Sequence, residues 1–427
     1  MGLHSLQHRG EESCGIAVSD TRRIRQITGM GLVAEVLDKK KLKGLKGRTA
    51  IGHVRYSTTG SSAIRNAQPF GINHHKACVS IAHNGNLTNA VRLRRQLEKK
   101  GAIFQTTMDS EVILHLLVRS SKEAFEEKLG EILPACKGAY SLIFLALDKL
   151  IGARDPYGFR PLCLGKKDDS YVLASETCAF DLIEAEYIRD IEPGEIVVIS
   201  KKGVESYKPF KEEIISQCIF EFIYFARPDS CMFGESIYQV RKRLGRKLAR
   251  EHPVSADMVI SIPDSGNYAA LGYSEQSKTP FEFGITRNHY IGRTFIQPSQ
   301  EMREHGVKVK LNPIKSALKG KRVVVVEDSI VRGTTTSGRI KAIREAGAKE
   351  IHMRISCPPI MFPCFYGIDF PSKDELIANK LTVEEIGKYI GVDSLKYLSL
   401  EGMMDAVKGS TGKFCTACFT GKYPLRK

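Results

Sequence analysis

The 427-residue chain has no apolar run close to the ~20 residues that a membrane-spanning helix requires. Its opening residues, MGLHSLQHRGEES, lack the apolar core of a signal peptide. Internal repeats and low-complexity tracts are missing too. The eleven cysteines are odd in number and too sparse for a disulfide scaffold. These absences argue against a membrane or secreted protein and predict a cytoplasmic one in a reducing compartment.

The composition allows real hydrophobic cores, because 42% of the residues are hydrophobic. The length favours two domains. A formal net charge of +16 is compatible with a nucleic-acid partner or with small anionic substrates. The basic residues are scattered, with short clusters at Lys39–Lys46 and Arg241–Arg250, so solvated faces explain most of the excess.

The first half of the chain contains many short β-like runs broken by Gly and Asn, with helical patterns between them. This mixture predicts antiparallel sheets packed with helices. The expected strands lie within Gly52–Gly60, Ala77–Leu87, Tyr140–Leu147 and Glu195–Ser200, and the expected helices at Asn89–Lys100 and Asp109–Leu117. The polar stretch Lys201–Ile214 is interpreted as a linker. Beyond it, strands alternate with helices, which predicts a parallel sheet.

The most informative stretch is VVVVEDSIVRGTTTSG, from Val323 to Gly338. Its four valines predict a buried parallel strand. The acids Glu327 and Asp328 follow at the strand's end, and Gly333 to Thr336 opens a helix whose N–H groups and hydroxyls suit a phosphate. The two carboxylates suit ribose hydroxyls, a metal ion or charge developing on a sugar ring. The order resembles the signature of type I phosphoribosyltransferases, although an ordinary strand, turn and helix with surface acids is the alternative.

Other residues of the second half fit the same chemistry. The turn PDSG, Pro263–Gly266, follows the apolar run that begins at Met258 and offers amides and the Ser265 hydroxyl to a pyrophosphate or its metal. Arg303, Lys308 and Lys310 follow GITRNHYIGRTFIQP and could fold over a polyphosphate as a closing loop. Taken singly, each of these residues fits an ordinary surface loop equally well.

Several motifs together resemble the glutamine phosphoribosylpyrophosphate (PRPP) amidotransferase family. SIPDSGNYAALGY, YIGRTFIQP and VEDSIVRGTTTSG occur in the family's order. LQHRGEES, GHVRYSTTG, HNGNL, TMDSE and DPYGFRPL resemble its glutaminase domain. The resemblance implies an α+β N-terminal-nucleophile glutaminase domain, residues 1–210, followed by an α/β type I phosphoribosyltransferase domain with a parallel sheet, residues 211–427. The implied reaction forms 5-phosphoribosylamine from PRPP and glutamine-derived ammonia, which is the first committed step of purine biosynthesis.

The resemblance assigns roles in the glutaminase half. Arg55 would hold the glutamine α-carboxylate, Tyr56 would lie on a closing loop, and Asp109 would bind the α-amino group. Asn84 and Gly85 would form the oxyanion hole. A turn residue or a surface charge is the alternative for each of these residues.

The family's nucleophile is a cysteine at the mature N-terminus, and this chain lacks it in the matching position. Cys14, in SCGIAV, imitates the family's Cys-Gly-Ile start but is expected to be a buried structural cysteine. We therefore expect either a record truncated at its start, with Cys-Gly encoded just upstream, or an ammonia-dependent transferase with an inactive glutaminase.

Some members of the family carry a 4Fe–4S cluster, and all four of its ligand positions are filled here. They are Cys218, Cys364, Cys415 and Cys418, the last two in a C-x-x-C. Cys231 and Cys357 do not match those positions. Zinc or unligated thiols remain the alternative.

The remaining expectations concern the transferase site and the partners. By resemblance, Ser265, Glu327 and Asp328 would hold Mg²⁺ and PRPP, and Gly333, Thr334, Thr335 and Thr336 the 5′-phosphate. Feedback by purine nucleotides and a homo-tetramer are implied in the same way. A phosphoribosyltransferase-fold regulator that binds nucleic acid is the alternative of another class. It would require a DNA-binding module, and the sequence shows no helix-turn-helix pattern.

Overall fold

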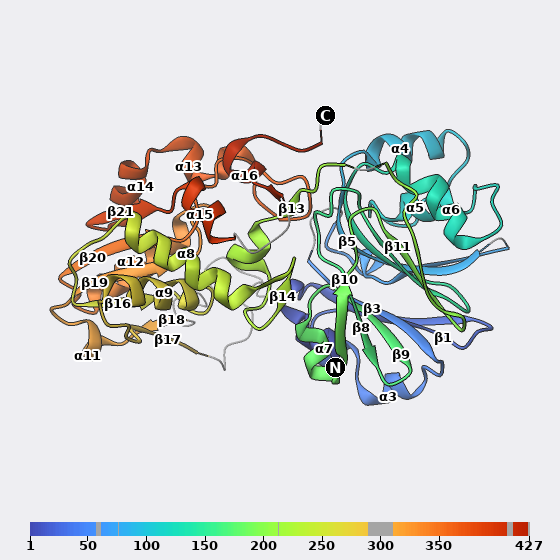
Figure 1. Cartoon of the computed structure of the whole chain (residues 1–427), viewed down its shortest axis with the longest axis horizontal. Helices are drawn as coiled ribbons and strands as arrows, with labels where there is room; N and C mark the ends of the chain where they lie inside the picture. Colours follow the sequence, from blue (N-terminus) through green and yellow to red (C-terminus); the bar gives the residue numbers. More distant parts are fainter. Residues whose placement is uncertain (57–60, 76, 212, 289–310, 408–412, 426–427) are drawn as a thin grey trace.

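The computed structural model describes residues 1–56, 61–75, 77–211, 213–288, 311–407 and 413–425. Figure 1 shows two lobes side by side, the first half of the chain on the right and the second half on the left. We call them the glutaminase half and the transferase half, after the resemblance above. The two largest clusters of buried apolar side chains lie one in each half. The boundary between residues 210 and 211 stays a prediction.

Antiparallel sheets form the glutaminase half, as the sequence predicts. The largest has six strands in the order β12 (Gly203–Tyr207), β11 (Ile196–Ser200), β7 (Leu150–Arg154), β6 (Gly138–Leu145), β5 (Ala77–Leu87), β4 (Phe70–His74). A second has the order β2 (Ile24–Met30), β1 (Ser13–Ser19), β3 (Thr49–Arg55), and a third β10 (Glu186–Asp190), β8 (Cys163–Lys167), β9 (Ser170–Ala174). Strand β12 lies inside the stretch interpreted as a linker, so that interpretation was wrong there. Its residues pair with β11 despite their polarity, because an edge strand needs only one apolar face.

Helices cover one side of the six-stranded sheet. Helices α4 (Ala90–Glu98), α5 (Glu111–Leu117) and α6 (Phe125–Ile132) bury leucine and isoleucine side chains against β5 and β6. The predicted helices thus exist and are one or two residues shorter at most ends. Short helices α1 (Gly2–Ser5), α2 (Val33–Val36), α3 (Lys39–Lys43) and α7 (Cys178–Ile183) lie around the smaller sheets.

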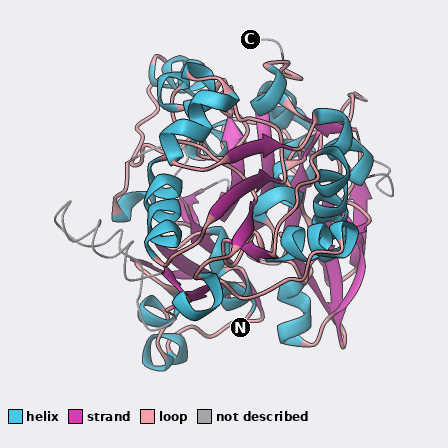
Figure 2. Cartoon of the chain, turned by 90° about the vertical axis from the view of Figure 1, so that its left-hand side faces the viewer, coloured by secondary structure: helices cyan, strands magenta, loops and turns pink. Residues whose placement is uncertain are grey.

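A parallel sheet forms the centre of the transferase half. Its order is β16 (Met258–Ser261), β19 (Arg322–Glu327), β20 (Glu350–Ile355), β21 (Ser394–Tyr397), with all pairs parallel. Figure 2 looks onto this half, and helices surround the sheet. They are α8 (Ile237–Glu251), α9 (Asn267–Ser277), α11 (Lys315–Leu318), α12 (Thr334–Glu345), α13 (Ile377–Lys380), α14 (Val383–Ile390), α15 (Leu400–Ala406) and α16 (Ala417–Thr420). Val323 to Val326 are fully buried, as a central parallel strand requires.

Smaller elements complete the transferase half. The two-residue strands β13 (Gln217–Cys218) and β22 (Phe414–Cys415) pair in parallel, and a π-helix, η4 (Glu221–Phe225), follows β13. Two antiparallel pairs are β14 (Cys231–Met232) with β15 (Glu235–Ser236) and β17 (Ile285–Arg287) with β18 (Leu311–Pro313). No helix in the described ranges is both long and apolar enough to cross a membrane.

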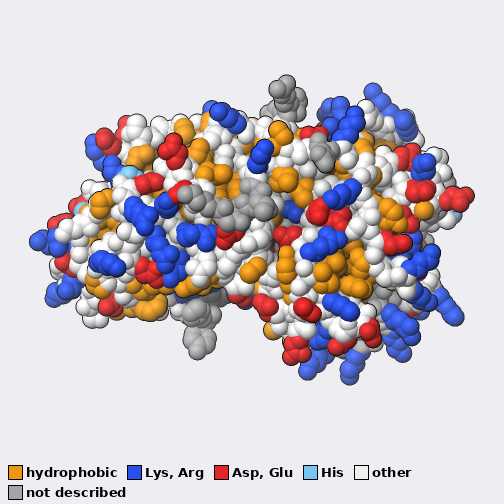
Figure 3. Space-filling model, viewed as in Figure 1, with side chains coloured by type: hydrophobic (Ala, Val, Ile, Leu, Met, Phe, Trp, Pro, Cys, Tyr) orange, Lys and Arg blue, Asp and Glu red, His pale blue; other side chains and the backbone are white. Residues whose placement is uncertain are grey.

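The positive charge is spread over the molecule. Figure 3 shows Lys and Arg side chains on both lobes of one face, with Asp and Glu between them. Within the cluster Arg241–Arg250, Arg243 pairs with Glu235, Arg246 with Glu275 and Lys247 with Asp405. This basic cluster is therefore largely paired with acids, as the solvated-face interpretation predicts.

Two candidate active sites and a cysteine-lined cavity

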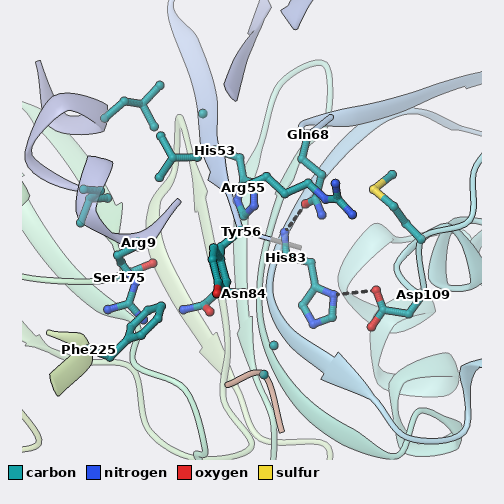
Figure 4. Close-up of a pocket in the computed structure, with 17 residues that line it drawn as sticks. Arg9, His53, Arg55, Tyr56, Gln68, His83, Asn84, Asp109, Ser175 and Phe225 are labelled. Atoms are coloured by element: carbon teal, nitrogen blue, oxygen red, sulfur yellow. Dashed lines mark hydrogen bonds and ion pairs between the residues drawn. The ribbon is translucent and has the colours of Figure 1, made fainter. Parts of the chain in front are cut away.

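A pocket of the glutaminase half collects the residues that the sequence singled out there. It encloses about 780 Å³, part of it open to solvent, and Arg55, Tyr56, Asn84, Gly85 and Asp109 all line it. Figure 4 shows how they converge from the end of β3, from β5 and from the segment before α5. Residues far apart in the sequence thus meet at one site, as the resemblance implies.

Arg55 and Asp109 are both buried and both have internal partners. Arg55 donates to Glu12, from the LQHRGEES segment that β1 places beside β3. Burial lowers the pKa of Arg55, and the charges of Glu12 and Asp109 oppose this shift. Asp109 accepts the backbone N–H of Leu87 at 2.8 Å. The pocket therefore already contains one arginine–carboxylate pair, which is the contact that a bound α-carboxylate would make.

Asn84 and Gly85 have the properties of an oxyanion hole. Among the described atoms the buried Asn84 Nδ2 has no hydrogen-bond partner. Gly85 has φ +144°, and a Cβ there would lie 2.1 Å from the carbonyl oxygen of Ala139. Only glycine fits this position, and an unpaired donor next to it is costly unless a ligand uses it.

His83 is a functional candidate that the sequence reasoning did not assign. Its ring Nδ1 lies 3.4 Å from the Asp109 carboxylate, and its backbone N–H donates to Gln68 Oε1 at 2.8 Å, as Figure 4 shows. Burial alone lowers the pKa of His83, but the charge of Asp109 and its hydrogen bonds raise it to a net value above normal. Burial raises the pKa of Asp109, but the charge and hydrogen bond of His83, with backbone hydrogen bonds, lower it by more. The pKa of Asp109 is therefore below its ordinary value. The signal was present in HNGNL, where His83 precedes Asn84.

The transferase half also contributes to this pocket. Phe225 and Gly367 line it, and Arg9 places its guanidinium 4.6 Å from the Phe225 ring centroid. Tyr56 donates its hydroxyl to Asp369 at 3.2 Å, and burial followed by that carboxylate raises its pKa to about 12. Residues 57–60 of the GHVRYSTTG motif lie outside the described residues. These contacts between the halves have no local sequence signal.

Cys14 is not part of the pocket. It lies in β1, fully buried, in a cluster with Val33, Val36 and Val54. Burial raises the pKa of its thiol to about 11. Its expected structural role is consistent with this placement. None of the residues that line the pocket, within the described part of the chain, is a cysteine.

The second site lies at the carboxyl ends of β16 and β19. These strands are parallel neighbours, with Ser261 opposite Val326, so the loops that follow them meet at the same sheet edge. Ser265 of the first loop donates its hydroxyl to the Asp328 carboxylate of the second. Ser329 Oγ lies 2.5 Å from the other oxygen of Asp328. The structure thus brings together the PDSG turn and the acidic pair.

The two acids have different partners. Glu327 accepts from Arg339 Nη1 at 2.5 Å and from Thr336 Oγ1 at 3.4 Å. Burial, with the neighbouring charge of Asp328, raises the pKa of Glu327 to about 7, although Arg339 opposes this. Burial also raises the pKa of Asp328, against the hydrogen bonds from Ser265 and Ser329. Carboxylates that resist ionisation in a buried site are typical of functional positions.

The expected phosphate cradle is only partly open. Gly333 caps α12 with φ +79°, and Thr334 and Thr335 are exposed in the first turn. Thr336 is buried and its hydroxyl bonds Glu327, so it faces the acid rather than solvent. Arg303, Lys308, Lys310 and the YIGRTFIQP motif lie outside the described residues.

A third feature is an apolar cavity lined by cysteines, with about 360 Å³ of empty space that is partly open to solvent. Four of its lining residues are Cys218, Cys364, Cys415 and Cys418, with aromatic and aliphatic side chains completing the wall. The pairing of β13 with β22 places Cys218 opposite Cys415. Burial raises the pKa of all four thiols, that of Cys218 to about 12. Cys231 and Cys357 do not line the cavity.

Known proteins give this geometry a context. A family model described as a glutamine amidotransferase domain matches residues 53–181. A chloroplastic amidophosphoribosyltransferase of Glycine max is 51% identical over all 427 residues and 75% of its own length. An amidophosphoribosyltransferase of Methanocaldococcus jannaschii is 50% identical, with 99% of this chain and 93% of that protein covered. The chain belongs to the amidophosphoribosyltransferase family.

Solved structures agree with this assignment. The B. subtilis glutamine PRPP amidotransferase in complex with ADP and GMP matches with a TM-score of 0.93 and 46% identity, over 100% of this chain and 94% of that one. The family's activity, and that of this chain, is pentosyl transfer that forms 5-phosphoribosylamine at the first committed step of purine biosynthesis. The nucleic-acid-binding alternative is not favoured by any of these relatives.

Proposed function

We propose that the pocket of the glutaminase half binds glutamine. Arg55 holds the α-carboxylate in place of Glu12, and Asp109 accepts from the α-amino group while His83 orients it. Asn84 Nδ2 and the Gly85 amide donate to the side-chain carbonyl oxygen of glutamine, the position that an oxyanion hole serves. The observation that supports this assignment best is the buried, unpartnered Asn84 Nδ2 on the pocket wall. Tyr56 closes the pocket from the side of Asp369.

At the second site, we infer that PRPP binds across the carboxyl edge of β16 and β19. Glu327 and Asp328 accept hydrogen bonds from the ribose hydroxyls, and the amides of Gly333 to Thr336 with the Thr334 and Thr335 hydroxyls bind the 5′-phosphate. The Ser265 turn holds the pyrophosphate. The contact between Ser265 and Asp328 supports this arrangement, because it brings the two loops close enough to contact one substrate.

The oxygen atoms of Ser265, Glu327 and Asp328 also fit Mg²⁺, which prefers hard oxygen ligands. Within the described residues no three His, Cys, Asp or Glu side chains are grouped to hold a metal ion by themselves. This suits Mg²⁺, which commonly takes one or two carboxylates and completes its shell with substrate phosphates and water. The ion would offset the charge of the leaving pyrophosphate.

The four cysteines match the ligand set of a 4Fe–4S cluster, which is held by four thiolates. They line one apolar pocket, and the pairing of β13 with β22 sets Cys218 opposite Cys415. Binding of a cluster would displace the protons of thiols whose pKa values are raised by burial. An all-thiolate zinc site would use the same ligands, so metal analysis decides between the two.

Three further properties complete the proposal. Purine nucleotides inhibit the enzyme, which is supported by the B. subtilis relative in complex with ADP and GMP. The chain assembles as a homo-tetramer, as the family resemblance implies, and works in the cytoplasm, as its composition predicts. Neither nucleic acid nor membrane is a partner.

Replacing Asp328 with Asn tests the transferase assignment. The change keeps the side chain's size and removes its charge, so ammonia-dependent formation of phosphoribosylamine should fall ~100-fold or more. Asp257→Asn is a matched control, because Asp257 pairs with Arg322 at the opposite end of β16 and β19. Unchanged turnover in Asp328→Asn would remove the assignment.

A further inference from the structure

A short segment of the transferase half, residues 364–370, separates the cysteine-lined cavity from the glutamine pocket. We call it the bridging segment. Its even-numbered residues, Cys364, Tyr366, Ile368 and Phe370, all line the cysteine-lined cavity. The odd-numbered residues between them contact the glutaminase half. The two sets alternate along the chain. One face of the bridging segment therefore lines the cysteine-lined cavity, and the opposite face contacts the glutaminase half.

The contacts with the glutaminase half fall on the pocket and directly beside it. The Phe365 carbonyl oxygen accepts from Asn86 Nδ2 at 3.0 Å, and Asp369 accepts from the Tyr56 hydroxyl at 3.2 Å. Between them, Gly367 lies against Gly85 and lines the pocket itself. Asn86 and Gly85 are adjacent in β5 and follow the oxyanion candidate Asn84.

The contact between Gly367 and Gly85 is too tight to take a side chain unless the Gly85 backbone shifts. Gly367 has φ +100°, and a Cβ there would lie 3.0 Å from Gly85 Cα and 3.2 Å from its carbonyl carbon. Gly85 cannot retreat, because a Cβ on it would already meet Ala139 on the neighbouring strand at 2.1 Å. The backbone around Gly85 is therefore fixed between β6 on one side and Gly367 on the other.

We propose that Gly367 is a positioning residue for glutamine, and that the glutamine pocket is complete only when the bridging segment is seated on β5. The inference rests on the proposed assignment of this pocket to glutamine. Gly367 forms the pocket wall opposite β6 and holds the Asn84–Gly85 backbone in the orientation that presents its donors to the ligand. Ammonia-dependent transfer takes place at β16 and β19 and does not use this wall.

The test is the binding of L-glutamine to the full-length chain, measured by isothermal titration calorimetry for the wild type and for Gly367→Ala. The methyl group overpacks a contact that cannot relax, so the dissociation constant should rise at least about tenfold. Ammonia-dependent formation of phosphoribosylamine should stay within about twofold of the wild type. Gly320→Ala is the matched control, because Gly320 also has a positive φ, +75°, but nothing lies within 4 Å of its added Cβ.

Each outcome decides. The inference is overturned if Gly367→Ala binds glutamine like the wild type. It is also overturned if Gly367→Ala loses ammonia-dependent transfer to the same extent as glutamine binding. If Gly367→Ala does not fold, Asn86→Ala replaces it: this change removes the hydrogen bond to Phe365 without adding bulk, and unaltered glutamine binding then overturns the inference. A wild-type chain that binds no glutamine overturns the proposed glutamine site and this inference together, so the two failures are distinguishable.

Discussion

Glu221 of the transferase half and Arg160 of the glutaminase half form an ion pair of 2.8 Å in which neither side chain is exposed to solvent. The same carboxylate accepts from Arg9 Nη2 at 2.8 Å, and Arg9 also pairs with Glu176. The guanidinium groups of both arginines lie over the Phe225 ring. A buried charge network thus fixes the π-helix η4, and with it Phe225, at the wall of the proposed glutamine pocket.

Replacing Glu221 with Gln should destabilise the whole chain. Two buried guanidinium groups would lose the charge that compensates their desolvation, and removing one partner of a buried pair typically costs ~3–5 kcal/mol. We expect the free energy of unfolding, measured by urea denaturation, to fall by that amount. The control is Glu192→Gln, which removes the partner of Lys208 in an exposed pair and should change stability by less than about 1 kcal/mol. Equal effects of the two changes would contradict the role of the buried network.

Local sequence patterns predicted the parts of this molecule that depend on neighbours in the chain. The valines of β19, the acids at its end and the glycine that caps α12 are consecutive, so strand, site and helix start could be predicted together. The contacts of Glu221, Gly367 and His83 depend on residues tens to hundreds of positions away. No periodicity or turn signal marks such contacts, because they arise only when distant segments of the chain pack together.

The linker interpretation of Lys201–Ile214 failed for a related reason. The segment is polar, which usually indicates a loop, but β11 offers an unpaired edge, and the backbone groups of Gly203–Tyr207 hydrogen-bond to it. The hydrogen-bonding demand of a neighbouring strand outweighed local polarity. The sequence grouped Thr336 with the phosphate-binding residues because a local motif could not show that the Thr336 hydroxyl bonds Glu327.

Low pH should weaken the contact between the two halves that involves Glu176. Burial alone raises the pKa of this carboxyl, but Arg9 and His8 more than compensate and hold it well below the ordinary value of 4.5. A carboxyl whose folded-state pKa is depressed contributes stability that is complete above its unfolded pKa and is lost as the pH falls below it. The difference in unfolding free energy between the wild type and Glu176→Gln should therefore be largest near pH 7 and shrink below about pH 4.5. A difference that stays constant from pH 7 to pH 3 would contradict this reasoning.

Arg339 should support PRPP binding through Glu327. Arg339→Met removes the cation that opposes the raised pKa of Glu327, so more of this carboxyl would be protonated at pH 7 and would accept more weakly from ribose hydroxyls. We expect the KM for PRPP in the ammonia-dependent reaction to rise about tenfold. Because the charged form returns as pH rises, the defect should be smaller at pH 9 than at pH 7.

Arg344→Met is the control for this change. Arg344 lies on the same helix, α12, and pairs with Asp393 in a half-exposed position away from the acids. Its loss should leave the KM for PRPP unaltered. A pH-independent defect in Arg339→Met would indicate that Arg339 contacts the substrate directly, and no defect at all would exclude both roles.

The cysteine quartet gives the last prediction. Protein purified without oxygen should be brown, with broad absorption in the blue and about four irons per chain. Cys364→Ser should lose colour and iron, because three thiolates would remain around the cavity. Cys357→Ser and Cys231→Ser should keep both, since Cys357 is buried and Cys231 exposed, and neither lines the cavity. A colourless wild-type protein with one zinc per chain would refute the cluster.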